Sequence, residues 1–380
     1  MRWMSSDSAP PHTSRPTLAP TRSVTVKAPG RLHLGFLDPS GSLGRRFGSL
    51  GLVIDGFATE LTLSAAAHDR IVAATPAAQA QQGRVAAHLQ ALRVQSGCMQ
   101  PLAVQLDEVL PAHAGFGSGT QLALAIGRAF TRWHRIDADT RTIARWLGRG
   151  LRSGVGIAGF DHGGLLLDGG PGADGSVAPL LARIAWPAAW AIVVVQDPRQ
   201  CGLAGPAERH AMASLPAMPR TLAADICHQV LMRVLPGAAD ADFAAFAAGL
   251  THMQALLGSH FAPAQHGGVY TSAAVGHAVQ WLAEAAAGDR CQLADEACAA
   301  SGQSSWGPTG FAILPSAARA QSLVDAARAA GAIDAALDVR IVGASSRGAT
   351  LAEPFPEYVS APVGAAITAA ARADRRVHHP

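Results

Sequence analysis

Pro111-Ala112-His113-Ala114-Gly115-Phe116-Gly117-Ser118-Gly119-Thr120-Gln121, followed directly by LALAIGRAF, is the stretch that decides the fold. The residues before it alternate between apolar and polar, as in a strand, with Leu102, Val104 and Leu106 on one side. The apolar residues after it recur at helical spacing, among them Leu122, Ile126 and Phe130. The order is therefore strand, glycine-rich loop, helix.

The glycines suit this loop to binding phosphate or pyrophosphate. Glycine lets the backbone approach a ligand closely, and the start of a helix offers free N–H groups and a positive dipole end. A plain turn, with Ser118 or Thr120 capping the helix, is an equally simple interpretation. A Rossmann fingerprint is excluded because it needs glycine where Thr120 stands. A Walker loop is excluded because it needs Gly-Lys-Ser/Thr, and the chain's single lysine is Lys27.

The composition is that of a globular protein rich in alanine. The 380 residues are 49% hydrophobic and 15% charged, and the formal net charge is +3. No basic block with interleaved aromatics is present, so we expect no nucleic-acid partner. No run is long enough to span a membrane, and the first residues lack the apolar core of a secretory signal. Proline and serine dominate residues 1–22, which we expect to be a disordered tail.

The cysteines give no sign of a disulfide framework or a zinc site. The five are scattered and no CxxC occurs; they are Cys98, Cys201, Cys227, Cys291 and Cys298. We expect them to be reduced thiols in a cytoplasmic protein.

A first strand over Ser23–Ala28 is interrupted by Pro29-Gly30 and resumes from Arg31 to Phe36. Arg31 and His33 then share one face of it. If that face points inward, burial is costly unless an anion pairs with them. A solvated polar face is the other interpretation. Arg45 and Arg46, in the glycine-rich connection that follows, are candidates for the same anion pocket.

A second glycine-rich stretch runs from Arg152 to Gly170 and contains Asp161-His162. Its glycines are too dense for a regular helix. A carboxylate beside an imidazole can do acid–base work or bind a metal. Neighbouring residues of an extended chain point in opposite directions, however, so a turn aspartate and a surface histidine are also consistent with the pattern.

The remainder of the chain predicts a second α/β unit. Ala189–Val195 is expected to be a buried strand, and helices are expected over 206–215, 219–235, 240–257 and 272–287. The cluster SSWGPTG, residues 304–310, then leads into a strand, followed by a helix over 316–330 and a last strand over 338–342. Few apolar residues recur after Ser345, so we expect that end to be frayed.

Three glycine/hydroxyl clusters in this order resemble the motifs of the GHMP kinase superfamily. VKAPGRLHLG resembles its first motif, PAHAGFGSGTQLALAIG its phosphate-binding second, and SSWGPTGFAIL its third. The resemblance implies an α+β fold of two domains, the first like ribosomal protein S5 domain 2 and the second ferredoxin-like. We place the first over residues 23–197, the second over 198–345, and a C-terminal extension over 346–380.

Within that superfamily the chain more closely resembles the β-ribofuranosylaminobenzene 5′-phosphate synthase family. The resemblance is carried by RLHLGFLDPSGSLGRRFGSLGL, SGVGIAGFDHGGLLLDGG, CGLAGPAE and SSWGPTG. It implies the joining of 5-phosphoribosyl 1-pyrophosphate to 4-aminobenzoate or 4-hydroxybenzoate, with release of carbon dioxide and pyrophosphate, in tetrahydromethanopterin biosynthesis. It also implies magnesium and no use of ATP.

The resemblance implies a set of site residues. Those expected to hold pyrophosphate are Gly115, Gly117, Ser118, Gly119, Thr120, Ser304, Ser305 and Gly307. Ser118 and Asp161 are expected to bind Mg²⁺. Arg31 is expected to grip the benzoate carboxylate or the ribose phosphate, and His33 or His162 to take the proton of the para group. Further substrate contacts are expected from Lys27, Arg45, Arg46, Ser153 and Gly154.

Other functions fit the same motifs. An ATP-dependent GHMP small-molecule kinase would use the loop for ATP and Asp161 as base. A non-catalytic protein that retained the fold would bind the phosphorylated ligand and form no product. An RNA-associated protein is disfavoured by the charge pattern. The sequence is also compatible with a homodimer.

Overall fold

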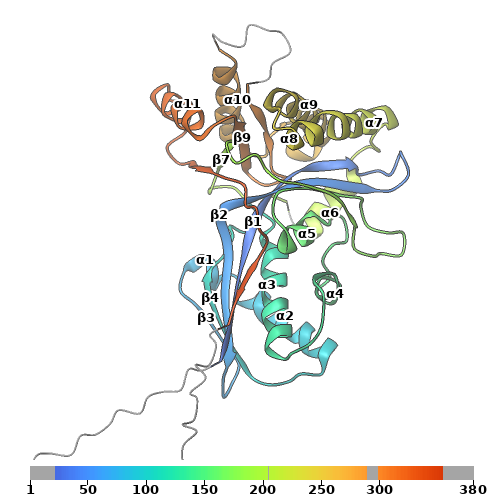
Figure 1. Cartoon of the computed structure of the whole chain (residues 1–380), viewed down its shortest axis with the longest axis vertical. Helices are drawn as coiled ribbons and strands as arrows, with labels where there is room; N and C mark the ends of the chain where they lie inside the picture. The colour runs from blue at the N-terminus through green and yellow to red at the C-terminus, as the bar shows by residue number, and fades with distance from the viewer. Residues whose placement is uncertain (1–21, 204, 289–297, 354–380) are drawn as a thin grey trace, which may run out of the picture.

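The computed structural model describes residues 22–203, 205–288 and 298–353. These residues form an elongated molecule built on two β-sheets, one above the other in Figure 1. The tail expected before residue 22 and the chain beyond residue 353 lie outside the described residues. Within the described ranges, no helix is both long and apolar enough to cross a bilayer.

Seven strands form the first sheet around a long antiparallel hairpin of β1 (Ser23–Asp38) and β2 (Phe47–Ala65). β11 (Thr350–Ala352) pairs with the outer edge of β1. On the other side, β4 (Leu102–Glu108) pairs with β2, and β3 (Arg70–Ala73) runs parallel to β4. β5 (Leu165–Asp168) pairs with the first part of β2 and with β6 (Leu180–Ile184).

Helices cover one face of this sheet, as Figure 1 shows. They are α2 (Gln82–Ser96), α3 (Ser118–Trp133), α4 (Thr140–Trp146) and α5 (Val155–Asp161), with the short α1 (Pro76–Gln79) beside β3 and β4. α3 is the central helix, and its residues from Gln121 to Gly127 are all buried. The glycine loop and the start of α3 are therefore held in place by the core beneath them.

The second sheet is antiparallel, in the order β10-β7-β9-β8. Its strands are β7 (Ala191–Gln196), β8 (Ala300–Gln303), β9 (Thr309–Leu314) and β10 (Asp338–Val342). One face packs on α10 (Ala273–Ala287) and α11 (Ala317–Ala329). The other faces α7 (Arg220–Gln229), η1 (Val230–Val234), α8 (Leu235–Ala239) and α9 (Phe243–Phe261). β7 reads as a continuous apolar run because both of its faces are covered.

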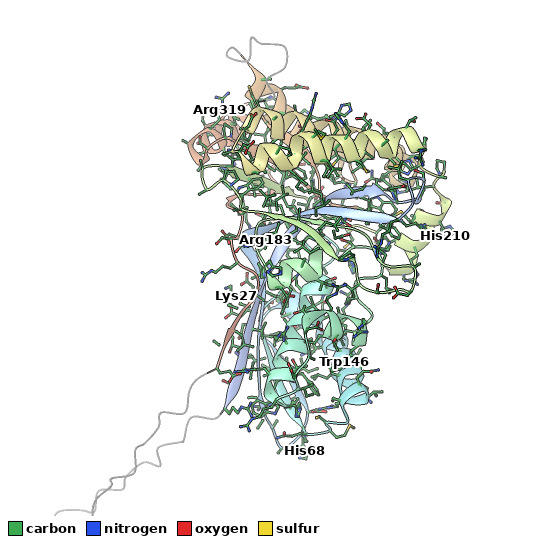
Figure 2. All side chains as sticks on the ribbon, turned by 45° about the vertical axis from the view of Figure 1, so that its right-hand side comes forward. Lys27, His68, Trp146, Arg183, His210 and Arg319 are labelled. Carbon is green, nitrogen blue, oxygen red and sulfur yellow. The ribbon has the colours of Figure 1, made fainter. Side chains whose placement is uncertain are left out.

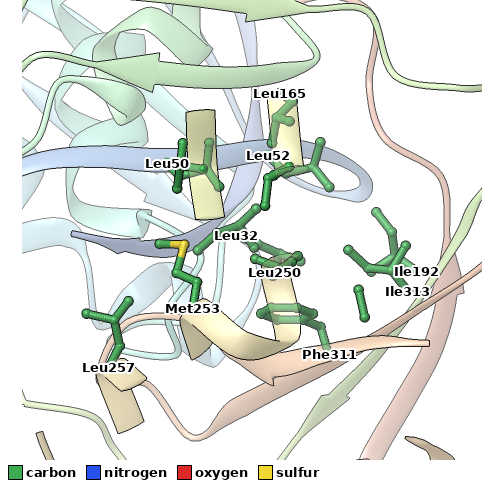
Figure 3. Close-up of a cluster of buried hydrophobic side chains, with 14 of the residues drawn as sticks. Leu32, Leu50, Leu52, Leu165, Ile192, Leu250, Met253, Leu257, Phe311 and Ile313 are labelled. Carbon is green, nitrogen blue, oxygen red and sulfur yellow. The ribbon is translucent and has the colours of Figure 1, made fainter. Parts of the chain in front are cut away.

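A shared core joins the two sheets (Figure 3). Leu32, Leu50 and Leu52 of the β1–β2 hairpin pack there with Ile192 and Ile313 of the second sheet and with Leu250 and Met253 of α9. The beginning of β1 instead contributes Val24 and Val26 to the core beneath α3. One strand thus supplies side chains to two hydrophobic cores.

Two expectations about backbone structure are wrong. The glycine-rich stretch forms the helix α5, because Gly156 and Gly159 let it pack within contact distance of Thr120 and Val53. The segment after Ser345 is ordered as far as β11 because it adds a strand to the first sheet. The domain boundary expected at residue 197 falls after β7. It therefore assigns a strand of the second sheet to the first domain.

The expectation of reduced cysteines holds for Cys98, Cys201 and Cys227, which are free thiols. It is wrong for Cys298, which is disulfide-bonded. Cys291 lies outside the described residues.

Candidate active site

The glycine loop ends in an uncapped helix. Gly117 is the N-cap of α3, has φ 77°, and offers no side chain to cap the helix. Gly115 also has a positive φ, of 94°, and a Cβ there would lie 2.5 Å from the carbonyl oxygen of Ser304. Both positions therefore require glycine. The first N–H groups of α3, on Ser118 and Gly119, receive no side-chain cap from Gly117, which is the arrangement that favours an anion.

Two β-bulges direct Arg31 and His33 toward this loop. The β1–β2 register shifts between Pro29 and Arg31 and again between His33 and Gly35. A bulge bends a strand and redirects its side chains. The backbone N–H of Arg31 donates to the Phe116 carbonyl, and its Nη1 donates to the Gly115 carbonyl at 2.7 Å.

The Arg31 side chain is partly buried, and its guanidinium is only partly paired. Its Nε has no hydrogen-bond partner among the described residues. Burial lowers the pKa of Arg31 to about 10, an effect that the nearby carboxylate of Glu208 partly opposes. A buried cation with a free donor is what a bound anion would stabilise.

The imidazole of His33 is 3% exposed, and neither ring nitrogen has a partner within the described part of the chain. Burial, with Arg31 and Arg152 nearby, holds the pKa of His33 well below its ordinary value. The ring packs edge-on against Phe36, with centroids 4.7 Å apart. His33 is therefore neutral at pH 7.

The SSWGPTG cluster, residues 304–310, links the glycine loop to the backbone of His33. Ser304 is fully buried; its Oγ donates to the Gly115 carbonyl at 2.8 Å and accepts the backbone N–H of His33 at 3.0 Å. The proton of this hydroxyl is therefore already donated within the protein, and the structure gives no support to the expectation that Ser304 binds phosphate. The N–H of Ser305 donates to the His33 carbonyl. A Cβ at Gly307 would lie 2.4 Å from the backbone of Ala114 and Gly115, so only glycine fits there.

These elements enclose a cavity of about 560 Å³, which we call the cationic cavity. Its lining includes five arginines and, among the described residues, a single carboxylate, Glu208; the arginines are Arg31, Arg84, Arg149, Arg152 and Arg209. The excess of four positive charges suits a ligand with several phosphates. The structure brings most of the expected phosphate and substrate residues to its wall: Gly115, Gly117, Ser118, Gly119, Thr120, Ser153, Ser305 and Gly307.

Sequence reasoning missed the basic residues on the far wall. Arg84 and His88 lie one turn apart on α2, and a Cβ on Gly119 would approach the guanidinium of Arg149 to 3.5 Å. Burial, together with Arg149 and Arg84, lowers the pKa of His88 to about 4. The i, i+4 spacing of Arg84 and His88 and the glycines on either side of Arg149 were the available signals.

Glu208, the last residue of CGLAGPAE, lies in the first turn of α6 (Gly205–Ser214). Its carboxylate pairs with Arg152 Nη2 at 2.7 Å, while Arg152 Nη1 is buried and has no partner in the described chain. The ion pair ties α6 to the loop that precedes α5.

Several predicted substrate contacts lie elsewhere. Lys27, labelled in Figure 2, does not line the cationic cavity. The strand alternation turns it to the outside, where its Nζ pairs with Glu60 at 2.9 Å. Arg45 donates to the Pro171 carbonyl and Arg46 to the Pro39 carbonyl, and neither lines the cavity. The structure therefore does not place these three expected substrate contacts at the cationic cavity.

Asp161 and His162 are also outside the cavity. They end α5 at the side away from the loop, both are exposed, and Asp161 accepts a hydrogen bond from Thr140 at 2.5 Å. Gly154 instead donates its N–H to the buried carboxylate of Asp168 at 2.7 Å. The acid–base role expected for Asp161 and His162 rested on their adjacency in the sequence, and the structure places neither side chain at the glycine loop. Gly154 does not line the cavity either.

The expected Mg²⁺ ligands do not fit together. Ser118 lines the cationic cavity and Asp161 does not. In the parts of the chain that the structure describes, no group of three or more His, Cys, Asp or Glu side chains could hold a metal ion.

Known proteins resemble this chain in sequence. Residues 83–164 match the GHMP kinases N terminal domain. The β-ribofuranosylphenol 5′-phosphate synthase of Archaeoglobus fulgidus is 30% identical over 245 residues, covering 61% of this chain and 76% of that protein. The chain belongs to this synthase family. The β-ribofuranosylphenol 5′-phosphate synthase of Methanothermobacter thermautotrophicus is 26% identical over 249 residues, covering 61% and 75%.

Solved structures confirm the fold of this synthase-family chain. Homoserine kinase from Cytophaga hutchinsonii matches with a TM-score of 0.57 and 15% identity, over 89% of this chain and 100% of that one. At that identity the match shows the two-domain GHMP-type α+β fold and nothing about substrate. The sequence expectations of fold and family are both confirmed.

Proposed function

We propose that this chain is a phosphoribosyltransferase that joins 5-phosphoribosyl 1-pyrophosphate to 4-hydroxybenzoate or 4-aminobenzoate, with release of carbon dioxide and pyrophosphate. The enzyme serves tetrahydromethanopterin biosynthesis. The observation that carries the proposal is the cationic cavity, with its five arginines, at the uncapped N-terminus of α3 in a chain of the synthase family. The GHMP fold alone would equally suit a kinase.

The cavity fits the charge of the donor. The free N–H groups at the start of α3 and the hydroxyls of Ser118 and Thr120 would hold the pyrophosphate. Arg31 would bind a phosphate oxygen through its unpartnered Nε. Magnesium enters our proposal as an ion carried by the donor's own pyrophosphate, since Mg²⁺ commonly binds through substrate phosphates.

The reaction breaks the bond from ribose C1 to pyrophosphate and forms one from C1 to the ring carbon that carries the carboxylate. The electron pair of the carbon–carboxylate bond then returns to the ring as carbon dioxide leaves. The para group keeps its proton overall, so no residue has to remove it, which withdraws that role from His33. A neutral, buried His33 adds no charge that would hold the carboxylate back.

Departure of pyrophosphate leaves a positively charged, oxocarbenium-like sugar. Glu208 is the one carboxylate among the described residues that line the cationic cavity. We assign it the role of stabilising that charge. Arg152 fixes its position, with Nη2 2.7 Å from the Glu208 carboxylate.

The test is release of labelled carbon dioxide from carboxyl-labelled 4-hydroxybenzoate or 4-aminobenzoate by the purified protein with donor and magnesium. Release that needs both substrates, and stops when a chelator removes the magnesium, supports the proposal. No release with either acid, but phosphorylation of a small alcohol by ATP, would show a kinase. We also propose a cytoplasmic location and a homodimer. Size-exclusion chromatography with light scattering would test the homodimer.

A further inference from the structure

A second cavity of about 340 Å³ adjoins the cationic cavity and is built differently. Five residues line both cavities and mark their junction: His33, Phe36, Glu208, Ser305 and Trp306. The rest of its wall comes mainly from α9, η2 (Ala262–Gln265) and β8, and includes Leu257, Phe261 and Val269. It has no arginine or lysine among the described lining residues. We call it the apolar cavity.

Three glutamine amides of this wall are occupied within the protein. Gln254 donates to the Leu34 carbonyl and accepts the N–H of Gln303. Gln303 donates to Gln265 Oε1 and to the Ser305 carbonyl, both at 2.8 Å. The amides of Gln254, Gln265 and Gln303 therefore support the wall and are not free to recognise a polar ligand.

The hydroxyl of Tyr270 is one of the polar groups of this wall that the protein does not occupy, as are the ring nitrogens of His33. Tyr270 lines the apolar cavity and not the cationic one, and its hydroxyl makes no hydrogen bond with any described residue. Burial raises the pKa of Tyr270 to about 12, so the phenol stays neutral and can both donate and accept.

We propose that the apolar cavity is the acceptor site, which binds the ring of a para-substituted benzoate with its carboxylate at the junction and its para group directed away from it, toward Tyr270. The proposal rests on the proposed function. The orientation follows from the chemistry, because the ring carbon that carries the carboxylate must reach C1 of a ribose held in the cationic cavity. Glu208 and His33 then face the carbon atoms that become bonded.

Volume and chemistry both suit this ligand. Small-molecule sites are mostly apolar cavities of about 300–1,000 Å³ with a few placed polar groups. The rings of Phe36, Phe261 and Trp306 offer faces and edges to an aromatic acid. As the ring attacks, its para hydroxyl or amine gains positive character and becomes a better donor to the Tyr270 oxygen.

The test combines direct binding with kinetics. Ala255, exposed on α9, lines the apolar cavity, so Ala255→Trp should fill it. Ala326→Trp, on the exposed face of α11, is the matched control. Equilibrium dialysis of labelled 4-hydroxybenzoate, with pyrophosphate present, should show affinity lowered about tenfold or more in Ala255→Trp and unchanged in the control. Tyr270→Phe should raise the KM for both acids and leave the KM for the donor unaltered.

Unchanged affinity in Ala255→Trp would overturn the acceptor site, as would an unmodified protein that binds neither acid. If the acids bind and Ala255→Trp weakens them, but the unmodified protein releases no carbon dioxide, the proposed function fails and the pocket assignment stands. If carbon dioxide is released at equal rates by Ala255→Trp and the unmodified protein, the function stands and the pocket assignment fails.

Discussion

Replacement of Arg31 by alanine tests the donor site most directly. The guanidinium donates to the Gly115 carbonyl at 2.7 Å and has one buried, unpartnered nitrogen available for the donor's phosphate. A hydrogen bond that involves a charged group contributes about 1.5–3 kcal/mol. Loss of that bond should therefore lower kcat/KM for the donor roughly 10- to 150-fold, at about 1.4 kcal/mol for each factor of ten.

The loop itself should survive the change. The Gly115 carbonyl also accepts the Ser304 hydroxyl at 2.8 Å, so it keeps a partner when Arg31 is absent. Arg31→Lys keeps the charge but cannot bond the carbonyl and the phosphate together in the fork of a guanidinium. We expect it to lose one hydrogen bond, about 1 kcal/mol, or roughly fivefold in kcat/KM.

The assay is the initial rate of carbon dioxide release as a function of donor concentration, with thermal melting to verify folding. Arg46→Ala is the matched control, since Arg46 is exposed and lies outside the cationic cavity. A kcat/KM for Arg31→Ala within twofold of the unmodified enzyme, or a loss no greater than in Arg46→Ala, would refute the assignment.

Three further predictions follow from the same site. Glu208→Gln should lower kcat about tenfold or more without raising the donor KM, because it removes negative charge needed only when the sugar becomes positive. Glu60→Gln, which alters a surface pair with Lys27, should leave kcat unchanged in the same steady-state assay. An unchanged kcat in Glu208→Gln would exclude the role of Glu208 in stabilising the sugar. Ser304→Ala should lower the free energy of unfolding by about 1–3 kcal/mol in urea titrations, because it deprives the buried His33 N–H of its acceptor, and an unaltered midpoint would contradict this. The free energy of unfolding should decrease as pH falls from about 6.5 toward 4, since burial depresses the pKa of His88 to about 4 and the unfolded state takes up the proton first. His88→Gln should make that decrease shallower in denaturant titrations at several pH values. An equally steep decrease in His88→Gln would count against the role of His88.

Local patterns were sufficient for most of the elements. The alternation of Leu102, Val104 and Leu106 identifies β4, and the helical spacing after Gln121 identifies α3. These signals lie within one element, where side-chain spacing reports burial directly. Gly156 and Gly159 were misread because their packing partners, Thr120 and Val53, lie far away in the chain.

The site was only half accessible from sequence. Arg31 and the loop glycines were found because their motifs are contiguous. The basic side chains Arg84 and Arg149 were not, since only tertiary packing carries α2 and the end of α4 to the start of α3. Asp161 shows the opposite error: a chemically attractive pair of neighbours that the end of α5 turns away from the loop. Ser304 lies next to the loop as expected, but its hydroxyl bonds to the backbone of Gly115 and His33.

The β1–β2 hairpin has a consequence for how the molecule melts. Val24 and Val26 lie in the core beneath α3, Leu32 and Leu34 lie in the core beneath α9, and Arg31 sits between them on the same strand. Neither core can open without withdrawing part of β1 from the other, so the two should lose structure cooperatively, as a single calorimetric transition. A ligand held at Arg31 would then protect both halves equally, and donor binding should shift the whole heat-capacity peak upward without splitting it.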